Sequence, residues 1–534
     1  MTRSAHHGGS ERDTARPRLL AVVITLALLA AACASGDDTS STDQAESDAA
    51  TTSSTNDGGT DAAADDQTDA AADAASEGAS SPGDDASPAP IAEPLFPIVD
   101  GRVEVPASWP VADQLDWMLD ALAASSTTED EVEARFSSAF LDEVPTSDVV
   151  SLIESARLLA TSFDVVEITF LTPIAARLMI GDPAAAEGLL LDLQVEHSTG
   201  QILLASLNPF PYEDSNTYPQ DVGITFEAGM ARLEESADAV GVVVAAIDGA
   251  ECRELAGHNA DQPLATGSNF KGYVLGALAA AVEAGELSLD APVVVTEDER
   301  APASFTDDIP AGAELSLVDA AALMMGMSDN TMTDHLHELV GREAVEQFVV
   351  EAGHADPSLL TPFVSVNEWD NLIFSIDNAQ AQAYLAATDD EQRAVLDDVI
   401  VAMRGTRVGG FANYAETLPL SWNASPLDMC RLMARLRQFE PGTDARRLVD
   451  VAYGSGGVLV GVRRHWDITW FKGGGIPTSD GTGLDVLTYG WMVENAGGAY
   501  AVVVMSNNGP VDEFDSASIS QRIHRILLDE LATS

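Results

Sequence analysis

Hydrophobic positions recur at two different periods in the first part of the chain that carries a regular pattern. In Asp113–Ala124 the apolar residues fall on one helical face, and Val149–Leu159 repeats this pattern. The segments that follow are rich in β-branched and other apolar residues and are separated by turn residues. They predict strands at Phe163–Leu171, Ala175–Ile180, Gly188–His197 and Gln201–Leu207. Helices followed by sequential strands indicate a small α+β accessory domain with an antiparallel sheet at residues 93–210.

Residues 211–534 predict a second, larger domain whose strands lie at its two ends. Val240–Ile247, the Asp248-Gly249 turn and Cys252–Ala256 predict a hairpin, and three more strands are expected at His465–Phe471, Leu487–Glu494 and Ala499–Met505. Between them helices are predicted at Lys271–Ala284, Leu317–Met327, Thr331–Leu339, Ala379–Ala387, Glu391–Met403 and Leu427–Phe439, and a closing helix at Ile519–Leu531. This order favours an α+β fold, an α-β sandwich whose antiparallel sheet is assembled from both ends around an inserted helical cluster. Residues at the seam between sheet and helices would line a cleft.

The first 33 residues predict an export signal. Arginines precede Leu19–Ala32, an apolar run of 14 residues, which is shorter than the roughly 20 that a transmembrane helix needs. Small residues directly before Cys33 resemble a bacterial lipobox, which implies lipidation of Cys33 and a lipoprotein on the outer face of the cytoplasmic membrane. The alternative is an ordinary secretory signal with an incidental cysteine and a secreted protein.

Composition excludes several classes of partner. The 534 residues carry 26 Lys+Arg against 86 Asp+Glu, a net charge of −60, which argues against binding nucleic acid or anionic lipid. Residues 34–92 are almost entirely small and acidic, so we expect a disordered tether. Contact with a membrane is therefore expected only through the lipid. After Cys33 only Cys252 and Cys430 remain; a disulfide between them is one alternative, and two small buried hydrophobic residues are our default expectation.

Only two of the 26 basic residues are lysines, Lys271 and Lys472. Ser268 and Lys271 are three residues apart where an apolar helix begins, so both lie on one face of its first turn. A serine hydroxyl needs a nearby base to act as a nucleophile, and a buried lysine that has lost its proton can supply one. Alone, S-x-x-K is a weak motif, but in this chain it holds one of two lysines.

Two further segments carry candidate chemistry. Ser328-Asp329-Asn330 lies between two predicted helices, where a proton shuttle and a substrate contact compete with an ordinary helix cap and turn. Lys472-Gly473-Gly474-Gly475 ends an aromatic strand, and its glycines would let a substrate approach the backbone. A lysine that simply ends a strand is the alternative.

Together these segments resemble S-x-x-K, S-D-N and K-[ST]-G, the three ordered motifs of class A β-lactamases and penicillin-binding proteins. The resemblance covers about Phe226 to Leu531. It implies that Ser268 is acylated, that Lys271 is its base, that Ser328 passes a proton to the leaving group and that Lys472 binds a substrate carboxylate. Asn330, Gly473 and Gly475 would contact substrate, and the N–H groups of Ser268 and Gly475 would form the oxyanion hole.

The two-domain arrangement also resembles a subgroup of actinobacterial serine hydrolases. These pair a small cystatin- or steroid-isomerase-like domain with a β-lactamase-like one, and the likeness rests on Ser137–Pro145 and Gln382–Arg393. It implies an enzyme of the β-lactamase type that forms an acyl-enzyme with β-lactams or related amides and esters, without a cofactor. We expect a monomer with a small-molecule substrate.

Three departures separate the chain from an ordinary β-lactamase. Gly473 stands where the family has Ser or Thr, the interval from Ser328 to Lys472 is long, and Glu368 is the only candidate for the deacylating base. Glu368 lies one residue too close to Asn371, so a carboxylate at a helix start is the alternative. Slow deacylation is expected. A non-catalytic or weakly active penicillin-binding envelope protein and a D-alanyl carboxypeptidase or esterase remain open. His335 and His337 are two residues apart on a helix and predict no metal site.

Overall fold

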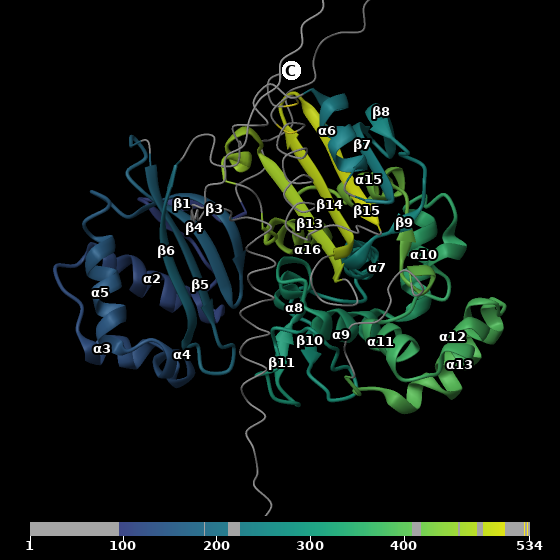
Figure 1. Ribbon diagram of the computed structural model, residues 1–534, viewed down its shortest axis with the longest axis horizontal. Coiled ribbons are helices and arrows are strands. Elements are labelled where there is room, and N and C mark those ends of the chain that lie inside the picture. The colour runs from purple at the N-terminus through teal and green to yellow at the C-terminus, as the bar shows by residue number, and fades with distance from the viewer. Residues whose placement is uncertain are drawn as a thin grey trace, which may run out of the picture. The chain divides into compact units, whose positions relative to one another are not determined.

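The structure, a computed structural model, describes residues 95–185, 187–211, 225–235, 237–407, 418–457, 460–477, 484–507, 528 and 531 (Figure 1). The export signal, Cys33, the tether at residues 34–92 and nearly all of the closing helix at Ile519–Leu531 lie outside these residues. No helix in the part described is both long enough and apolar enough to cross a membrane.

A helical layer and an antiparallel sheet form the accessory domain, as its pattern predicts. After the short pair β1 (Ile98–Val99) and β2 (Arg102–Val103), α2 (Pro110–Ala123) and α5 (Thr146–Ala156) bury their apolar faces. The short α3 (Glu129–Arg135) and α4 (Ser138–Glu143) were not predicted; α3 buries only Val132, so its sequence carries no helical period. The strands pair in sequence order and are β3 (Asp164–Thr172), β4 (Ala175–Gly181), β5 (Glu187–Val195) and β6 (Ile202–Pro211).

The larger domain contains a five-stranded antiparallel sheet drawn from both of its ends, which confirms the predicted fold class. Its strand order is β13-β14-β15-β7-β8. The hairpin strands are β7 (Ala239–Asp248) and β8 (Glu251–His258), and the late strands are β13 (Ile468–Pro477), β14 (Leu484–Asn495) and β15 (Gly498–Asn507). Alternate residues of β7 join two different hydrophobic clusters, so the strand is covered on both faces and its sequence is continuously apolar.

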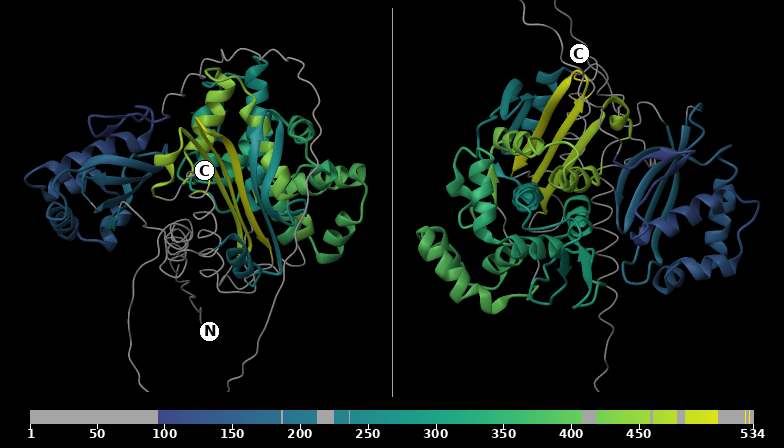
Figure 2. Two further views of the ribbon diagram at one scale, coloured as in Figure 1. Left: turned by 90° about the horizontal axis from the view of Figure 1, so that it is seen from above. Right: turned by 180° about the vertical axis from the view of Figure 1, so that it is seen from behind.

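Helices and short connections fill the interval between the two groups of strands, and Figures 1 and 2 show that some of them lie beside the sheet while others lie farther from it. Central among them is α7 (Lys271–Glu283), which is apolar all round and almost wholly buried. The other helices of this interval are α8 (Leu317–Gly326), α9 (Asn330–Val340), α10 (Arg342–Glu351), α11 (Val366–Phe374), α12 (Asn378–Leu385), α13 (Asp389–Asp398), α15 (Pro426–Arg437) and α16 (Asp444–Gly454), whereas α6 (Phe226–Glu234) precedes β7. The short pieces are β9 (Leu264–Ala265), β10 (Pro292–Val294), β11 (Glu314–Ser316), β12 (Asn423–Ala424) and the 3₁₀ turns η2 (Gly267–Phe270), η3 (Pro357–Leu360), η4 (Ile400–Met403), η5 (Leu418–Leu420) and η6 (Val462–His465).

Two sequence-based expectations are wrong. The expected strand His465–Phe471 begins only at Ile468 and continues through the three glycines to Pro477, because each of them pairs with a residue of β14. The default expectation of two unbonded cysteines also fails, since Cys252 in β8 and Cys430 in α15 form a disulfide. The helix α15 packs against β8, which brings their Cα atoms to 6.3 Å, within the usual range for a disulfide.

Strand β3 of the accessory domain packs against elements that lead to the chemical motifs. Its buried Glu167 accepts hydrogen bonds from the N–H of Gly461, at 2.8 and 3.0 Å, and from Nε of Arg464 at 2.9 Å. At the end of β3, the methyl group of Thr172 lies 2.5 Å from the place that a Cβ on Gly326 would occupy. Gly326 is the last residue of α8, two positions before Ser328, so the accessory domain supports this turn from behind.

Candidate active site

Ser268 lies in the 3₁₀ turn η2, which runs directly into α7. In a 3₁₀ turn residues three apart are eclipsed, so Ser268 and Lys271 stack on one side, and the N–H of Lys271 donates to the carbonyl of Ser268. Two contacts fix the turn: Asn269 Nδ2 donates to Thr488 O of β14 at 3.3 Å, and Phe270 stacks on Trp422 with ring centroids 3.7 Å apart. Ser268 is half-buried, whereas Lys271 is fully buried beneath it.

The amine of Lys271 contacts the Ser328–Asn330 turn. Its Nζ donates to Ser328 O at 2.5 Å, to Ser328 Oγ at 3.3 Å and to Asn330 Oδ1 at 2.7 Å. Among the residues described, no hydrogen bond joins Nζ to Ser268 Oγ.

Ser328 has a left-handed backbone, with φ at +58°. This conformation costs a non-glycine residue roughly 1–3 kcal/mol and persists only where the surroundings impose it. It allows Oγ to accept from Lys472 Nζ at 2.9 Å as well as from Lys271. Of the three acceptors around Lys271, Ser328 Oγ alone carries a hydrogen, so it can donate back once the amine is neutral.

Burial governs the charge of both lysines. It lowers the pKa of Lys271 from 10.5 to about 7, against the opposing influence of the Asp329 and Asp334 carboxylates. Burial, followed by the charge of Lys271, lowers the pKa of Lys472 well below its ordinary value. Lys271 can therefore be neutral near pH 7 and act as a base.

Glycines in β13 and η2 allow the strand to approach the turn that carries Ser268. A Cβ on Gly474 would lie 2.4 Å from Thr266 O and 2.8 Å from Ser268 N, and one on Gly267 would lie 2.7 Å from Gly475 N. These are backbone atoms that cannot move aside at small cost. The turn and the strand therefore touch without side chains between them, which places the N–H groups of Ser268 and Gly475 in the same region. Gly475 is exposed, as an oxyanion donor must be.

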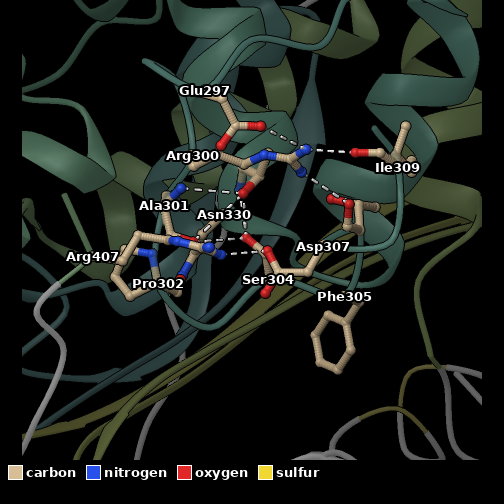
Figure 3. A network of polar contacts seen from close by, with 12 residues as sticks. Glu297, Arg300, Ala301, Pro302, Ser304, Phe305, Asp307, Ile309, Asn330 and Arg407 are labelled. Carbon is tan, nitrogen blue, oxygen red and sulfur yellow. Dashed lines mark hydrogen bonds and ion pairs between the residues drawn. The ribbon is translucent and has the colours of Figure 1, made fainter. Parts of the chain in front are cut away.

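A loop built on buried Arg300 holds the Ser328–Asn330 turn (Figure 3). The Arg300 guanidinium donates to the carbonyls of Thr306 and Ile309 and closes the loop on itself. Pro302 O then accepts from Asn330 Nδ2 at 2.8 Å, and the N–H of Phe305 donates to Asp329 Oδ2 at 2.7 Å. The resemblance implies that Asn330 contacts substrate. In the structure, its Oδ1 accepts from Lys271 and its Nδ2 donates to this loop.

Glu368 serves as a helix-start carboxylate. Its Oε2 accepts from the N–H of Ser365 at 2.8 Å in a capping box, and its Oε1 accepts from Arg342 Nη2 at 2.6 Å. Both carboxylate oxygens of Glu368 are therefore engaged by other groups rather than placed to activate a water molecule. This geometry matches the alternative interpretation of Glu368, a carboxylate at the start of a helix.

Four residues before Asn371, at the spacing expected for a deacylating glutamate, the chain has Asn367. Its Nδ2 donates to Arg300 O and to Thr406 O, each at 3.0 Å, and its Oδ1 accepts from Asn371 Nδ2 at 3.1 Å. The side chain is buried and every polar atom has a partner. An amide fits here because two carbonyls require a donor.

The helical histidines are held within the fold. His335 Nε2 accepts from the N–H of Thr296 at 2.8 Å, so its Nδ1 carries the hydrogen that faces Thr331 O at 2.8 Å. His337 stacks on Phe363, and burial lowers its pKa to about 4. Within the described ranges no three His, Cys, Asp or Glu side chains are grouped so as to hold a metal ion.

The structure thus brings together Ser268, Lys271, Ser328, Asn330 and Lys472 with the backbone of Gly473–Gly475. Sequence reasoning missed Asn269, the Arg300 loop and Asn367. Of these, only Asn367 could have been found from the sequence, by its spacing of four residues from Asn371. The sequence does not indicate that an arginine such as Arg300 will be buried or that an asparagine such as Asn269 will hold a turn in place.

Two segments of the chain match models of known protein families. Residues 226–447 match the model of the beta-lactamase enzyme family, a range that ends before Lys472, and residues 106–197 match the model of the ORF 12 gene product N-terminal region. No curated protein matches the sequence.

Solved structures of β-lactamases are similar at low identity. A class A β-lactamase from Bacteroides cellulosilyticus is 18% identical, covers 59% of this chain and 98% of its own, and has a TM-score of 0.41. β-Lactamases from Chitinophaga pinensis and Sphaerobacter thermophilus are each 19% identical with TM-scores of 0.40, covering 57% and 58% of this chain and 98% and 99% of theirs. By its matched segments, the chain carries a domain that matches the beta-lactamase enzyme family, preceded by one that matches the ORF 12 gene product N-terminal region.

Proposed function

We propose that this protein is a serine hydrolase that forms an acyl-enzyme at Ser268 with β-lactams or related amides and esters. The observation that carries the proposal is the shared contact of Lys271 and Lys472 with Ser328 Oγ, next to the turn that presents Ser268. The chain's only two lysines meet at this atom. Such an arrangement moves protons between a nucleophile and a leaving group.

The acylation step uses these groups in sequence. Lys271, neutral near pH 7, takes the proton of Ser268 Oγ as that oxygen attacks the carbonyl carbon. The oxyanion that forms is held by the N–H groups of Ser268 and Gly475. When the C–N or C–O bond breaks, the leaving atom takes a proton from Ser328 Oγ, which regains one from Lys271. The products are the Ser268 ester and the protonated leaving group.

Deacylation is proposed to be slow. Water must attack the ester with help from a base, yet Glu368 is engaged in a helix cap and ion pair, and Asn367 is an amide without a basic atom. A long-lived acyl-enzyme favours weak β-lactamase or esterase activity over rapid hydrolysis.

Intact-protein mass spectrometry after mixing with a β-lactam tests the proposal. We expect a mass increase equal to the whole β-lactam, located at Ser268, lost in Ser268→Ala and sharply reduced in Lys271→Ala. Hydrolysis of 4-nitrophenyl esters is measured in parallel. If wild type neither acquires an adduct nor hydrolyses an ester faster than Ser268→Ala, the proposal is wrong.

A second candidate is a non-catalytic envelope protein that binds such molecules without turnover. Gly473 and the absence of a free carboxylate on α11 favour it. Steady-state turnover of nitrocefin or an ester above the Ser268→Ala control would exclude it. A D-alanyl carboxypeptidase, the remaining alternative, would release D-alanine from a cell-wall peptide.

We also propose that the protein is exported as a monomer and anchored by lipid at Cys33. The lipobox-like segment supports this location. Membrane fractionation of the producing cell tests it, since Cys33→Ala should move the protein from the membrane to the medium.

A further inference from the structure

A cavity of about 600 Å³ lies where β8, the C-terminal end of α10 and α15 meet. Its volume is within the range of sites that bind small molecules. No residue that lines this cavity belongs to the candidate active site. The lining residues that carry charged or reactive groups are Glu251, Cys252, Glu351, Arg431 and Arg435.

Arg431 retains hydrogen-bond donors for a ligand. Its Nη1 donates to Oδ1 of Asp428, a buried carboxylate, at 2.7 Å. Within the described ranges this is the one hydrogen bond of Arg431, whereas a guanidinium carries five N–H groups. The Arg431 side chain is 35% exposed, so its remaining N–H groups are accessible from the cavity.

Arg435 lies one helical turn farther along α15, on the same face as Arg431. Its guanidinium carbon is 5.3 Å from the centroid of the Phe348 ring and 4.8 Å from that of Phe439, and these contacts hold the group in place. Its Nη2 lies 3.5 Å from Oε2 of Glu351, at the outer limit of a hydrogen bond. The two arginines therefore place a pair of cations on one wall of the cavity.

Two carboxylates balance these cations. Glu251, at the start of β8, and Glu351, at the end of α10, are both exposed. Equal numbers of guanidinium and carboxylate groups complement a zwitterion, whose own carboxylate contacts an arginine while its ammonium contacts a glutamate. Such a ligand carries no net charge, so the chain's excess of 60 negative charges does not repel it.

The disulfide supplies a reactive group on the same cavity. Cys252 is half-buried and lines the cavity, whereas its partner Cys430 is fully buried and does not. Thiolates attack a disulfide at the sulfur that they can reach. A thiol held in the cavity therefore meets the sulfur of Cys252 first.

We propose that this cavity binds small zwitterionic thiols of the amino-acid type and directs them to the Cys252–Cys430 disulfide. The bound thiol loses its proton, and its thiolate forms a bond to Cys252 Sγ. The bond between the two cysteines breaks with its electron pair on Cys430 Sγ, which takes up one proton. The products are a mixed disulfide on Cys252 and a Cys430 thiol, so the protein gains the mass of one whole thiol and no other reactant is needed.

Three matched thiols test the proposal on the intact protein. Cysteine carries both charged groups, 3-mercaptopropionate lacks its ammonium, and cysteamine lacks its carboxylate. Reactions are quenched with acid at early times, intact-protein mass spectrometry gives the rate of adduct formation, and peptide mapping locates the adduct. Each rate constant is expressed per thiolate and divided by the value for two short peptides joined by the same disulfide, which removes the intrinsic reactivity of the thiol.

We expect this ratio to be at least about tenfold higher for cysteine than for either partial thiol, the value of one charged hydrogen bond. If the overall charge of the chain governed the exchange, cysteamine would have the highest ratio and 3-mercaptopropionate the lowest. That order would overturn the proposal. A ratio for cysteine no higher than the other two, an adduct located on Cys430, or no adduct with any thiol would overturn it as well.

Variants locate the two contacts. Arg435→Gln should remove the advantage of cysteine over cysteamine, and Glu251→Gln should remove its advantage over 3-mercaptopropionate. Arg447→Gln, at an exposed position of α16 outside the lining, changes the net charge as Arg435→Gln does and should keep the wild-type ratios. Glu251 is exposed, so its substitution keeps the test available where Arg435→Gln fails to fold. Unchanged ratios in Glu251→Gln, or equal effects of Arg435→Gln and Arg447→Gln, would overturn the assignment to this cavity.

Discussion

Lys271 and Lys472 meet at one atom, the Oγ of Ser328, which accepts from their amines at 3.3 and 2.9 Å. Two ammonium groups this close repel each other in a buried site, so the two amines together carry less than two positive charges near neutral pH. The hydroxyl between them can accept from one amine while it donates to the other. The left-handed backbone of Ser328 is the local strain that keeps the hydroxyl in this place.

The first prediction concerns the pH dependence of acylation. Lys271 is active when neutral, so kcat/KM for an uncharged ester should rise with pH and level off above about 7, the pKa that burial gives this amine. Below that pH the ammonium form dominates and the rate falls about tenfold per pH unit. Lys271→Ala should lose roughly 10²–10⁴-fold of the rate together with this rise. A wild-type profile that is flat from about pH 5.5 to 8.5 would contradict the role of Lys271.

The candidate motifs and the sheet could be located from the sequence because both rest on local signals. The motifs around Ser268, Ser328 and Lys472 each have characteristic residue types, and the strands at both ends of the larger domain are strongly apolar. Their convergence on one oxygen was not predictable. It depends on the left-handed turn at Ser328, and serine gives no sequence sign of that conformation.

Features that depend on distant packing escaped the sequence. Arg300 closes a loop through carbonyl groups, which every residue has, so its partners cannot be read from the chain. The Cys252–Cys430 bond spans 178 residues and depends on α15 lying on β8. The strand was expected to end before the glycines of β13, although their lack of side chains allows the strand to continue and to approach a turn.

The second prediction tests the close approach of β13 to the turn that carries Ser268. In Gly474→Ala the new Cβ would press on Thr266 O and Ser268 N, moving the nucleophile turn from the strand that carries Gly475. We expect acylation to fall by about 10²-fold, the usual effect of an oxyanion donor moved out of place. Gly475→Ala keeps its N–H and has space for the methyl group, with nearest contacts of 3.6 Å, so it should be much less affected. Equal losses in the two variants, measured as acylation rates, would refute the steric argument.

A third prediction concerns Asn367. In Asn367→Asp the amide donor becomes a carboxylate that faces the carbonyls of Arg300 and Thr406. The change should lower the free energy of unfolding by roughly 1–3 kcal/mol at pH 7. The buried carboxyl would have a pKa above its unfolded value of about 3.9, so the loss should shrink as pH falls toward 4.

Denaturant unfolding at several pH values measures this effect, and the matched control is Asn378→Asp. Asn378 is exposed at the first position of α12, where a carboxylate is tolerated or favourable. Its free energy of unfolding should change by less than about 0.5 kcal/mol. A loss in Asn367→Asp that is independent of pH would show that the two carbonyls are not its cause. Deacylation should not become faster, since the new carboxyl is held against acceptors rather than water.

The fourth prediction addresses the accessory domain. Glu167→Ala removes the acceptor of Gly461 N–H and the ion-pair partner of Arg464, in a buried position where such a change costs roughly 3 kcal/mol. Because β3 also supports Gly326 behind the Ser328 turn, the rate of acylation should fall together with stability. Glu133→Ala, at an exposed position of α3 in the same domain, is the control and should change neither. Lower stability in Glu167→Ala with an unaltered acylation rate at low temperature would show that the support is dispensable.

The last prediction concerns the disulfide. Closing a loop of 178 residues restricts the unfolded chain, and the entropic model assigns this a stabilisation of roughly 5 kcal/mol as an upper figure. Cys430→Ala and Cys252→Ala should therefore lose similar free energies of unfolding, measured with guanidinium in the absence of reductant. The double variant should lose no more than either single one, because all three lack the same bond. Losses that add up would mean that each cysteine contributes through packing, and wild type in reductant would then remain more stable than either variant.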